Sequence, residues 1–367
     1  MATIGNAAAP STNTIYYDSL LSTTLMAYRD TLYDNIFKDS AVLAYLRMTD
    51  AVKKQNGGER VALPLMYETN KTVKSYQGEE VIDTTIQDGL STAFYEWREV
   101  AGTLSITRRE ERQNSGEGRL INLLESKIKQ AEMTIREELN RQIVQGTVSG
   151  ATFVPGNSGK DIYPLAYFLR KNNQVDPTTG GSVGNISGST YSWWRHQTAV
   201  LDSGTKDTGN AFALSVSTYA GLKVALRRMY NYCSRGSGGS PDLIVCDQNT
   251  FETYENALDT QIRYQNNKMA DMGFDTVKLR GATVLWDETI PDIDNGTVAI
   301  TAGTAFYLNT KFYNLIIDSE TDIVVTPFVE PENQTVKTAK ILFMGNTAVS
   351  NLRKHGVCYA ISQSIAA

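Results

Sequence analysis

The longest regular pattern of apolar residues in the chain lies between Ser115 and Gly146. Asn114 or Ser115 can cap its start, and Gly146 can end it in the left-handed conformation. Acidic residues stand four positions before basic ones in the pairs Glu125/Lys129, Glu132/Arg136 and Glu137/Arg141. Apolar residues recur in steps of three and four, on one helical face, at Leu120, Leu124, Ile128, Ala131, Ile135, Leu139 and Ile143. The pattern predicts one helix of about 45 Å with a single face in a core.

A second pattern, the strict alternation typical of a β-strand, follows Gly57-Gly58 at Val61, Leu63, Leu65 and Tyr67. Pro64 lies inside this run, which limits it to an edge strand or an exposed ribbon. Another extended run covers Thr92–Val100, and the polar, charged segment Asn70–Leu90 separates the two runs. The arrangement predicts a long β-hairpin. Because an isolated two-stranded ribbon is marginal in water, we expect this hairpin to lie on another subunit.

The rest of the chain favours strands with a few helices. Val100–Thr107 alternates and is expected to lead as a strand into the long helix, and Tyr163–Lys171 is expected to form a short helix. Residues 217–232 predict an amphipathic helix capped by Ser217, and Asn249–Leu258 a capped helix. Buried or alternating strands are predicted at Pro241–Asp247, Thr276–Leu279, Thr283–Asp287, Thr304–Leu308, Leu315–Asp318, Ile323–Val329, Ala339–Asn346 and Gly356–Ile361. The fold class is therefore α+β.

Composition excludes several classes of protein. Hydrophobic residues make up 41% and charged residues 20% of the 367 positions, which is ordinary for a globular chain and excludes global disorder. The net charge is −5, and no segment is basic enough to bind nucleic acid through counterion release. Cys233, Cys246 and Cys358 are scattered and predict reduced, buried thiols. The sequence shows neither a signal peptide nor an apolar run of the roughly 20 residues that a membrane span needs, so we expect folding in a cytoplasm.

Catalytic and metal-binding motifs fail when they are compared with the sequence residue by residue. Asp161 follows Gly159-Lys160, where a phosphate loop requires Ser or Thr. Two histidines, His196 and His355, offer little for a zinc pair or a Ser-His-Asp triad. Asp318, Glu320 and Asp322 resemble half a calcium loop, but Ile323 stands where the glycine belongs, which favours a solvated turn. We therefore expect no enzymatic activity and assign no catalytic, cofactor-binding or metal-binding residue.

Trp193 and Trp194 are adjacent, beside Tyr191 and His196. Two neighbouring rings could form a platform on which a ligand stacks. The more common role of such large rings is packing at a seam between domains, and this role is the one we predict.

The order of these parts resembles that of the major capsid proteins of tailed bacteriophages, known for the Hong Kong 97-type fold. A loose N-terminal segment, a long charged hairpin, an isolated long helix, an α/β middle and a return in strands follow one another in both. Local strings add to the resemblance at Tyr191-Ser192-Trp193-Trp194-Arg195, Pro241–Asp247, Gly281–Pro291 and Phe306-Tyr307-Leu308-Asn309. The resemblance covers nearly the whole chain.

The resemblance implies five parts and a function in assembly. These parts would be an N-terminal arm (1–52), an extended loop (53–98), a peripheral domain (99–194) with a spine helix (115–146), an axial domain (195–322) and C-terminal strands returning to the peripheral domain (323–367). Copies would assemble as hexamers and pentamers into an icosahedral head that encloses double-stranded DNA without reading its sequence. The virion would be assembled in the cytoplasm of a bacterial host.

The resemblance also implies partners. A portal protein would occupy one vertex, a scaffolding protein would be a separate chain, and a decoration protein is possible. On the extended loop, charged residues are expected to contact a neighbouring subunit: Lys71, Lys74, Glu79, Glu80 and Asp83. Some family members join subunits through a Lys–Asn isopeptide bond, for which Lys71 or Lys74 with Asn333 or Asn346, assisted by Glu332, would be the candidates here.

Three alternatives remain open from the sequence. An encapsulin-type shell of a cellular compartment resembles the same fold. A carbohydrate-binding module would use Trp193 and Trp194. A hydrolase would use Asp287 or Glu288, although adjacent residues on a strand point apart and a second carboxylate would have to come from elsewhere.

Overall fold

The computed structural model describes residues 41–113, 123–145, 148–149, 154–170, 182–202, 211–258, 277–290, 303–332 and 335–362. Within the described residues the chain divides into two compact units. One comprises Gly102–Thr134 and Val325–Ile341, and the other Lys38–Ala101, Ile135–Val324 and Leu342–Ala367. Most of the predicted N-terminal arm lies outside the described residues.

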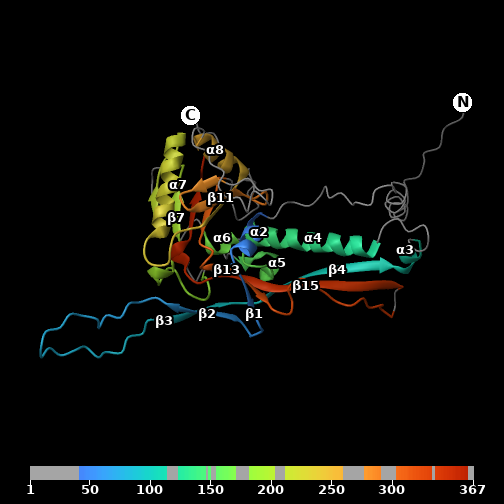
Figure 1. The fold of residues 1–367 in the computed structure, drawn as a ribbon, viewed down its shortest axis with the longest axis horizontal. Coiled ribbons are helices and arrows are strands. Elements are labelled where there is room, and N and C mark those ends of the chain that lie inside the picture. Colours follow the sequence, from blue (N-terminus) through green and yellow to red (C-terminus); the bar gives the residue numbers. More distant parts are fainter. Residues whose placement is uncertain are drawn as a thin grey trace. The chain divides into compact units, whose positions relative to one another are not determined.

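The larger unit contains a mixed seven-stranded sheet in the order β10-β11-β9-β12-β16-β7-β8 (Figure 1). Its strands β9, β11 and β12 are apolar and buried, as expected for a sheet covered on both faces. The pairs β9–β11, β7–β16 and β7–β8 are parallel, and the pairs β10–β11, β9–β12 and β12–β16 are antiparallel. The bounds are β7 (Gln197–Val200), β8 (Phe212–Ala213), β9 (Leu243–Cys246), β10 (Val277–Leu279), β11 (Ala282–Trp286), β12 (Ala305–Leu308) and β16 (Gly356–Tyr359).

The two faces of this sheet belong to two separate cores. On β9, Ile244 and Cys246 face a cluster formed with helices α7 (Tyr219–Ser234) and α8 (Gln248–Leu258). Leu243 and Val245, at the alternate positions, belong to a second cluster that includes α2 (Ala41–Met48) and α6 (Leu165–Phe168). The alternation of a strand therefore assigns successive side chains to different cores. Helix α2 is a packed element, although it falls within the predicted arm.

Local chemistry sets the helix starts. Thr218, rather than the predicted Ser217, caps α7 by accepting a hydrogen bond from Gly221 N at 3.2 Å. The carboxylate of Asp247 accepts hydrogen bonds from the backbone N and the hydroxyl of Thr250 at 3.3 and 2.6 Å in the first turn of α8. The short helix expected at Tyr163–Lys171 is reduced to α6.

A second sheet has the order β1-β13-β15-β14, with β4 also paired to β15. Its bounds are β1 (Val52–Gln55), β4 (Arg98–Thr107), β13 (Tyr313–Asp318), β14 (Val324–Val325) and β15 (Val336–Val349). Strands β13 and β15 are antiparallel, whereas β1 and β13 are parallel. Of the strands predicted beyond Ile323, β14 and β15 join this sheet, and β16 joins the seven-stranded one.

The predicted hairpin is present as β2 (Val61–Met66) and β3 (Leu90–Tyr95). The two strands pair antiparallel in a sheet of their own, where Pro64 faces Thr92 on the partner strand. The predicted run Thr92–Val100 was too long, because β3 ends at Tyr95 and β4 begins at Arg98.

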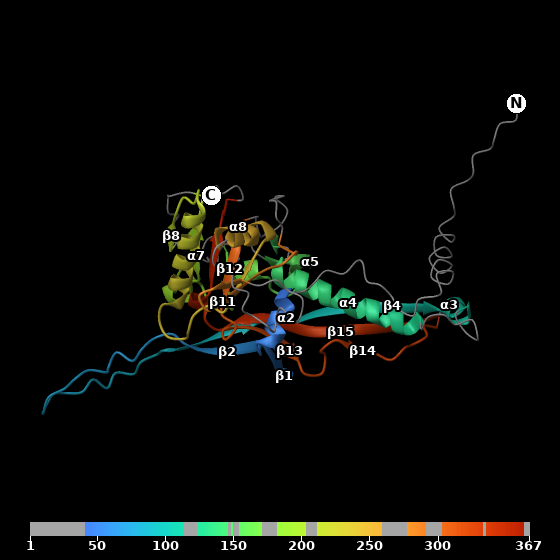
Figure 2. The same ribbon diagram turned by 45° about the horizontal axis from the view of Figure 1, so that its top comes forward.

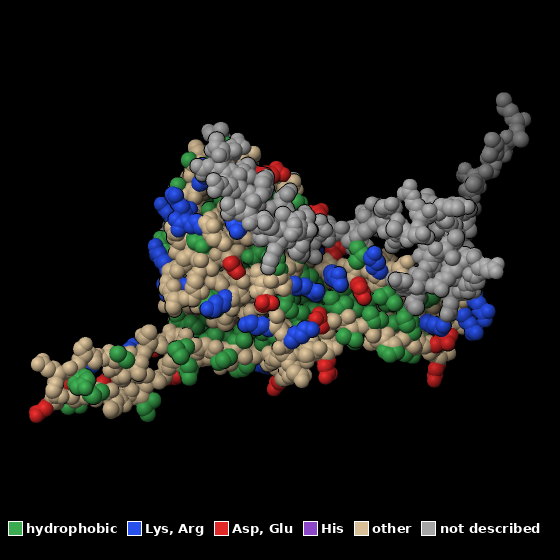
Figure 3. All heavy atoms as spheres, in the orientation of Figure 1, with side chains coloured by type: hydrophobic (Ala, Val, Ile, Leu, Met, Phe, Trp, Pro, Cys, Tyr) green, Lys and Arg blue, Asp and Glu red, His purple; other side chains and the backbone are tan. Residues whose placement is uncertain are grey.

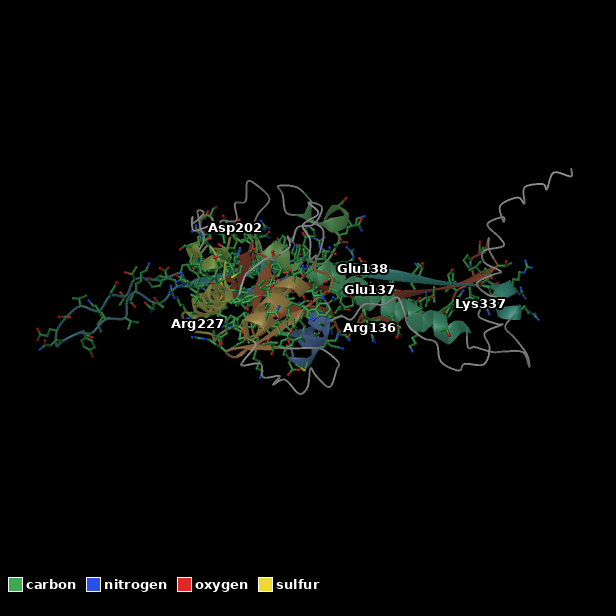
Figure 4. All side chains as sticks on the ribbon, turned by 90° about the horizontal axis from the view of Figure 1, so that it is seen from above. Arg136, Glu137, Glu138, Asp202, Arg227 and Lys337 are labelled. Atoms are coloured by element: carbon green, nitrogen blue, oxygen red, sulfur yellow. The ribbon has the colours of Figure 1, made fainter. Side chains whose placement is uncertain are left out.

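The long helix is α4 (Leu123–Val144), and residues 114–122 of the predicted span lie outside the described part of the chain. Ile135, Leu139 and Ile143 of the predicted apolar face are buried, whereas Ile128 is only partly buried. Figure 4 labels Arg136, Glu137 and Glu138 on this helix. Arg141 binds Glu138, at N···O distances of 2.8 and 2.5 Å, instead of the predicted Glu137.

The smaller unit holds most of β4 and the helix α3 (Arg108–Gln113). Thr107 and Glu110 form a capping box at the start of α3: Glu110 N donates to the Thr107 hydroxyl at 3.3 Å, and Thr107 N donates to the Glu110 carboxylate at 3.0 Å. Lys127 of α4 pairs with the same carboxylate at 3.2 Å. Burial raises the pKa of Glu110, but these three contacts outweigh it and hold the pKa below its usual value.

Candidate functional site

Within the predicted extended loop (53–98), the chain between β2 and β3, residues 67–89, forms the outer part, and from here on the name extended loop refers to residues 67–89. Its two limbs run side by side away from β2 and β3 (Figures 1 and 2). At its base, Tyr67 N donates to Gly89 O at 3.1 Å. Further out, Asn70 and Asp83 each accept a backbone and a hydroxyl hydrogen bond from the threonine two positions later. These hydrogen bonds of the outer loop are local, and most of its side chains are exposed.

The two basic residues predicted to contact a neighbour bond within the loop. Lys71 forms an ion pair with Glu68, and the hydrogen bond in this pair raises the pKa of Lys71. Lys74 Nζ donates to Val81 O at 3.2 Å, across the two limbs. Such exposed contacts contribute little to the stability of the loop.

The acidic residues fall into two kinds. The side chain of Asp83 accepts hydrogen bonds from the threonine two positions later, which lowers the pKa of Asp83. Glu79 and Glu80 lie at the tip, in a turn where Glu80 N donates to Gln77 O at 3.4 Å and Gly78 has a φ of +58°. Neither glutamate forms an ion pair with a residue that the structure describes. The tip therefore presents two carboxylates without a cation of their own. A role of all five charged residues in subunit contacts stays a prediction.

The extended loop and its two strand ends also expose large apolar side chains, which the sequence analysis missed. Figure 3 shows hydrophobic side chains on the surface of this segment. The exposed fraction reaches 87% for Val81 and 96% for Ile86. The full set is Met66, Val73, Tyr76, Val81, Ile82, Ile86 and Leu90. The signal was present as isolated apolar residues in a polar segment, but no period of two or 3.6 connects them.

Trp193 and Trp194 lie at the base of the extended loop. Trp194 is 2% exposed and its indole N–H donates to Val183 O at 3.0 Å. Trp193 stacks on Tyr67, with ring centroids 4.9 Å apart and planes 11° apart. The two tryptophan rings meet edge to face at 64°, so they do not offer a joint flat surface to a sugar. Their contacts support packing, and the predicted role at a domain seam stays a prediction.

A cleft of about 240 Å³ opens beside this stack. Aromatic and cationic side chains line it, among them Tyr67, Trp193, Arg235, Arg353 and Lys354. Lys354 is 1% exposed, and its ammonium group donates to the carbonyls of Arg235, Gly236 and Gly239 at 3.1 Å each. Burial and the neighbouring Arg353 lower the pKa of Lys354. We call this cleft the base cleft.

The residues considered for catalysis have structural roles. Asp287 is buried, and its carboxylate accepts hydrogen bonds from Asn140 Nδ2 at 3.1 and 3.3 Å and from Thr289 N at 2.9 Å. Buried and already bonded, this carboxylate is not placed to attack or protonate a substrate. The hydrolase alternative therefore has no support from Asp287.

The acidic triplet that resembled a calcium loop forms a turn. Asp318 accepts hydrogen bonds from Gly57 N, Glu320 N and the Thr321 hydroxyl, and the last of these contributes most to lowering the pKa of Asp318. Asp322 pairs with Lys54 at 3.2 Å. Among the described residues, no cluster of three His, Cys, Asp or Glu side chains could hold a metal ion.

The remaining predicted groups are buried. The three cysteines are free and buried, as predicted, and burial raises the pKa of each thiol. Asn346, a candidate for an isopeptide bond, is 1% exposed and its amide donates to Glu96 O at 2.6 Å, which leaves it out of reach of a lysine on another subunit. Asn333 lies outside the described residues. None of the described helices has an apolar stretch long enough to cross a bilayer.

Comparison with known proteins shows the class of fold. No protein-family model matches the sequence, and no curated protein matches it. Solved structures of bacteriophage capsid proteins match over most of their length, and the chain has their α+β fold. This result confirms the fold predicted from the resemblance to tailed-phage major capsid proteins.

Three solved structures illustrate the similarity. The capsid asymmetric unit of cyanophage A-1(L) matches with a TM-score of 0.66 at 14% identity, covering 90% of this chain and 95% of that chain. The capsid of the native GTA particle matches with a TM-score of 0.54 at 11% identity, covering 91% and 96%. The capsid of cyanophage P-SCSP1u matches with a TM-score of 0.53 at 12% identity, covering 91% and 92%.

Proposed function

We propose that this chain is the major capsid protein of a tailed bacteriophage, a structural subunit without catalytic activity. Copies assemble as hexamers and pentamers into an icosahedral shell around double-stranded DNA, in the cytoplasm of a bacterial host. A portal protein occupies one vertex and a scaffolding protein is a separate chain, while a decoration protein is an optional addition to the shell. The shared fold of the phage capsid structures supports this proposal.

The observation that carries the proposal is the extended loop. A monomer would leave its apolar side chains in water, including Val81 and Ile86. Burying each one fully against a neighbour would contribute about 1.5–3 kcal/mol. Heterologous contacts of this kind form rings when the rotation between neighbours closes, as a shell of hexamers and pentamers requires. The proposal includes the five parts predicted from the sequence, from the arm (1–52) to the C-terminal strands (323–367).

Electron microscopy of the purified, expressed chain tests the proposal. We expect closed icosahedral particles, alone or with a scaffolding protein. Deletion of Asn70–Leu90 should leave a folded subunit, with unchanged circular dichroism, that forms no particles. Normal yields of particles from the deletion would contradict the role of the extended loop.

A matched pair of variants, both with the natural loop length, tests whether burial of the apolar side chains is needed for assembly. Replacing Val73, Val81, Ile82 and Ile86 by Ser should prevent assembly. Replacing four polar loop residues, Ser75, Gln77, Thr84 and Gln87, by Ala should not. Equal assembly of both variants would show that the exposed apolar side chains are not buried in the particle.

The contents of the particle separate the two kinds of shell. A phage head encloses double-stranded DNA, whereas the encapsulin-type alternative encloses a protein cargo. Nuclease-protected DNA of uniform length in particles from infected cells supports the phage head. Particles that hold an enzyme and no DNA would favour the cellular compartment.

A further inference from the structure

The base cleft is positively charged without compensation. Its twelve lining residues include three cationic ones, Arg235, Arg353 and Lys354, and none is acidic. Lys354 is held by backbone carbonyls, which leave its positive charge uncancelled. The Arg235 guanidinium lies 4.0 Å from the centre of the Tyr232 ring and, like Arg353, forms no ion pair with a described residue. A cluster of this kind is suited to a carboxylate-bearing ligand.

The cleft also offers hydrogen-bond donors and an apolar wall. Ser237 and Asn351 line it, and the indole N–H of Trp193 is buried without an acceptor among the described residues. The stacked pair of Tyr67 and Trp193 forms the apolar wall. A ligand that matches this lining carries an anion next to apolar groups.

The tip of the extended loop has the complementary character. Glu79 and Glu80 are exposed and form no ion pair with any residue of the described part of the chain. The same tip exposes Tyr76 and Val81, one on each side of the two carboxylates. The tip thus carries carboxylates flanked by apolar side chains. The cleft carries cationic side chains beside a pair of stacked aromatic rings.

The tip that enters the cleft has to come from a second copy. Tyr67 lines the cleft, whereas Gly78 stands at the far end of the extended loop. An extended limb rises roughly 3.3 Å per residue, so the two positions are about 35 Å apart along the limb. The tip cannot reach the cleft of its own chain while the loop stays extended.

We propose that the base cleft of one subunit binds the Glu79–Glu80 tip of another copy of this chain. The carboxylates bind Arg235 and Arg353, and the flanking apolar side chains pack near Tyr67 and Trp193. This inference rests on the proposed assembly and adds to it a receptor for the loop. Each subunit is then both donor and acceptor, so the contact propagates around a ring.

Disulfide trapping in assembled particles tests the contact directly. Glu80 and Ser237 are both replaced by Cys in one chain, and particles are oxidised and run on a denaturing gel without reductant. We expect covalent dimers and larger ladders from the double variant and monomers from each single variant, because the three native thiols are buried. Monomers from the double variant in intact particles would overturn the proposal.

Charge exchange provides an independent readout. Glu79→Lys with Glu80→Lys, or Arg235→Glu with Arg353→Glu, should each raise the protein concentration needed for assembly by about tenfold or more, as expected for lost charge-assisted contacts. Combining all four changes should restore it. Arg227→Glu on α7, an exposed arginine outside the cleft labelled in Figure 4, is the control and should assemble normally.

The outcomes separate this inference from the proposed function. Wild-type chain that forms no particles under any condition overturns the proposed function and the inference with it. Wild-type particles together with normal assembly of both charge-reversed pairs overturn the cleft alone. If the variant that carries all four charge changes does not regain assembly, the pairing of tip and cleft is also overturned.

Discussion

At the scale of single residues, one buried asparagine joins three elements of the larger unit. Asn140 on α4 accepts a hydrogen bond from Leu43 N of α2 at 3.4 Å and donates to the carboxylate of Asp287, which follows β11. The carboxylate is buried and forms no ion pair with a described residue, so these hydrogen bonds and those from Thr289 stabilise it.

Replacing Asn140 by Ala should therefore lower the free energy of unfolding by about 2–3 kcal/mol, because a buried carboxylate and an amide lose their partner. Urea unfolding followed by circular dichroism measures the change. Lys129→Ala, at an exposed position of the same helix, is the control and should change stability by less than about 0.5 kcal/mol. Equal effects of the two substitutions would show that the bridge is not stabilising.

Two buried histidines should make stability depend on pH. Burial lowers the pKa of His196 to about 4, and burial with the charge of His196 lowers that of His355 to about 3. Both pKa values lie below the unfolded value of about 6.5, so the unfolded chain binds protons first as the pH falls. The contribution of the two neutral histidines to the free energy of unfolding is present above pH 6.5. Below this pH the free energy of unfolding should decrease by up to about 1.4 kcal/mol per pH unit for each histidine.

Substitution tests this dependence between pH 6.5 and pH 5, above the range in which carboxylates titrate. His355 Nδ1 accepts a hydrogen bond from Asn309 N at 3.2 Å, which an Asn side chain can replace. His355→Asn should reduce the slope of unfolding free energy against pH by about half, since one of two histidines is removed. An unchanged slope would exclude His355 as a source of acid sensitivity.

At the scale of elements, helix α4 buries its apolar face unevenly. Ile135 is 5% exposed, whereas Ile128 is only partly buried in a single chain. Ile135→Asp should abolish soluble expression, because it places an unpaired charge in the core of the larger unit. Ile128→Asp should stay soluble with a smaller loss of stability, which corrects the expectation from the apolar repeat alone. Soluble expression of both variants at wild-type levels would contradict the burial of the stripe.

The elements show how far the sequence could be read. Strand β12 was predicted within one residue and β9 within two, because short apolar runs between turn residues leave few alternatives. The break between β3 and β4 was missed, since Glu96 and Trp97 continue the alternation across it. At the candidate site, the charges of the extended loop were predicted but its exposed apolar residues and the base cleft were not. The cleft joins Tyr67, Trp193, Arg235 and Arg353, which only tertiary folding brings together.

At the scale of the whole molecule, the state of assembly should control access to the extended loop. Lys71 and Lys74 lie on an exposed limb, so trypsin should cut there rapidly in the free subunit. Under the proposed assembly a neighbour covers the loop in the particle, so cleavage there should be much slower. Mass spectrometry of digests taken over time measures both rates. Equal rates in subunits and particles would contradict burial of the loop on assembly.

The position of β16 in the seven-stranded sheet has a consequence for synthesis on the ribosome. β7 and β8 connect to the other strands of that sheet only through β16, which the ribosome makes long after them. Until Tyr359 has emerged, the cores on both faces of the sheet lack the residues that β16 contributes to them. Translation order thus keeps β7 and β8 separate from the rest of this sheet until β16 has been made.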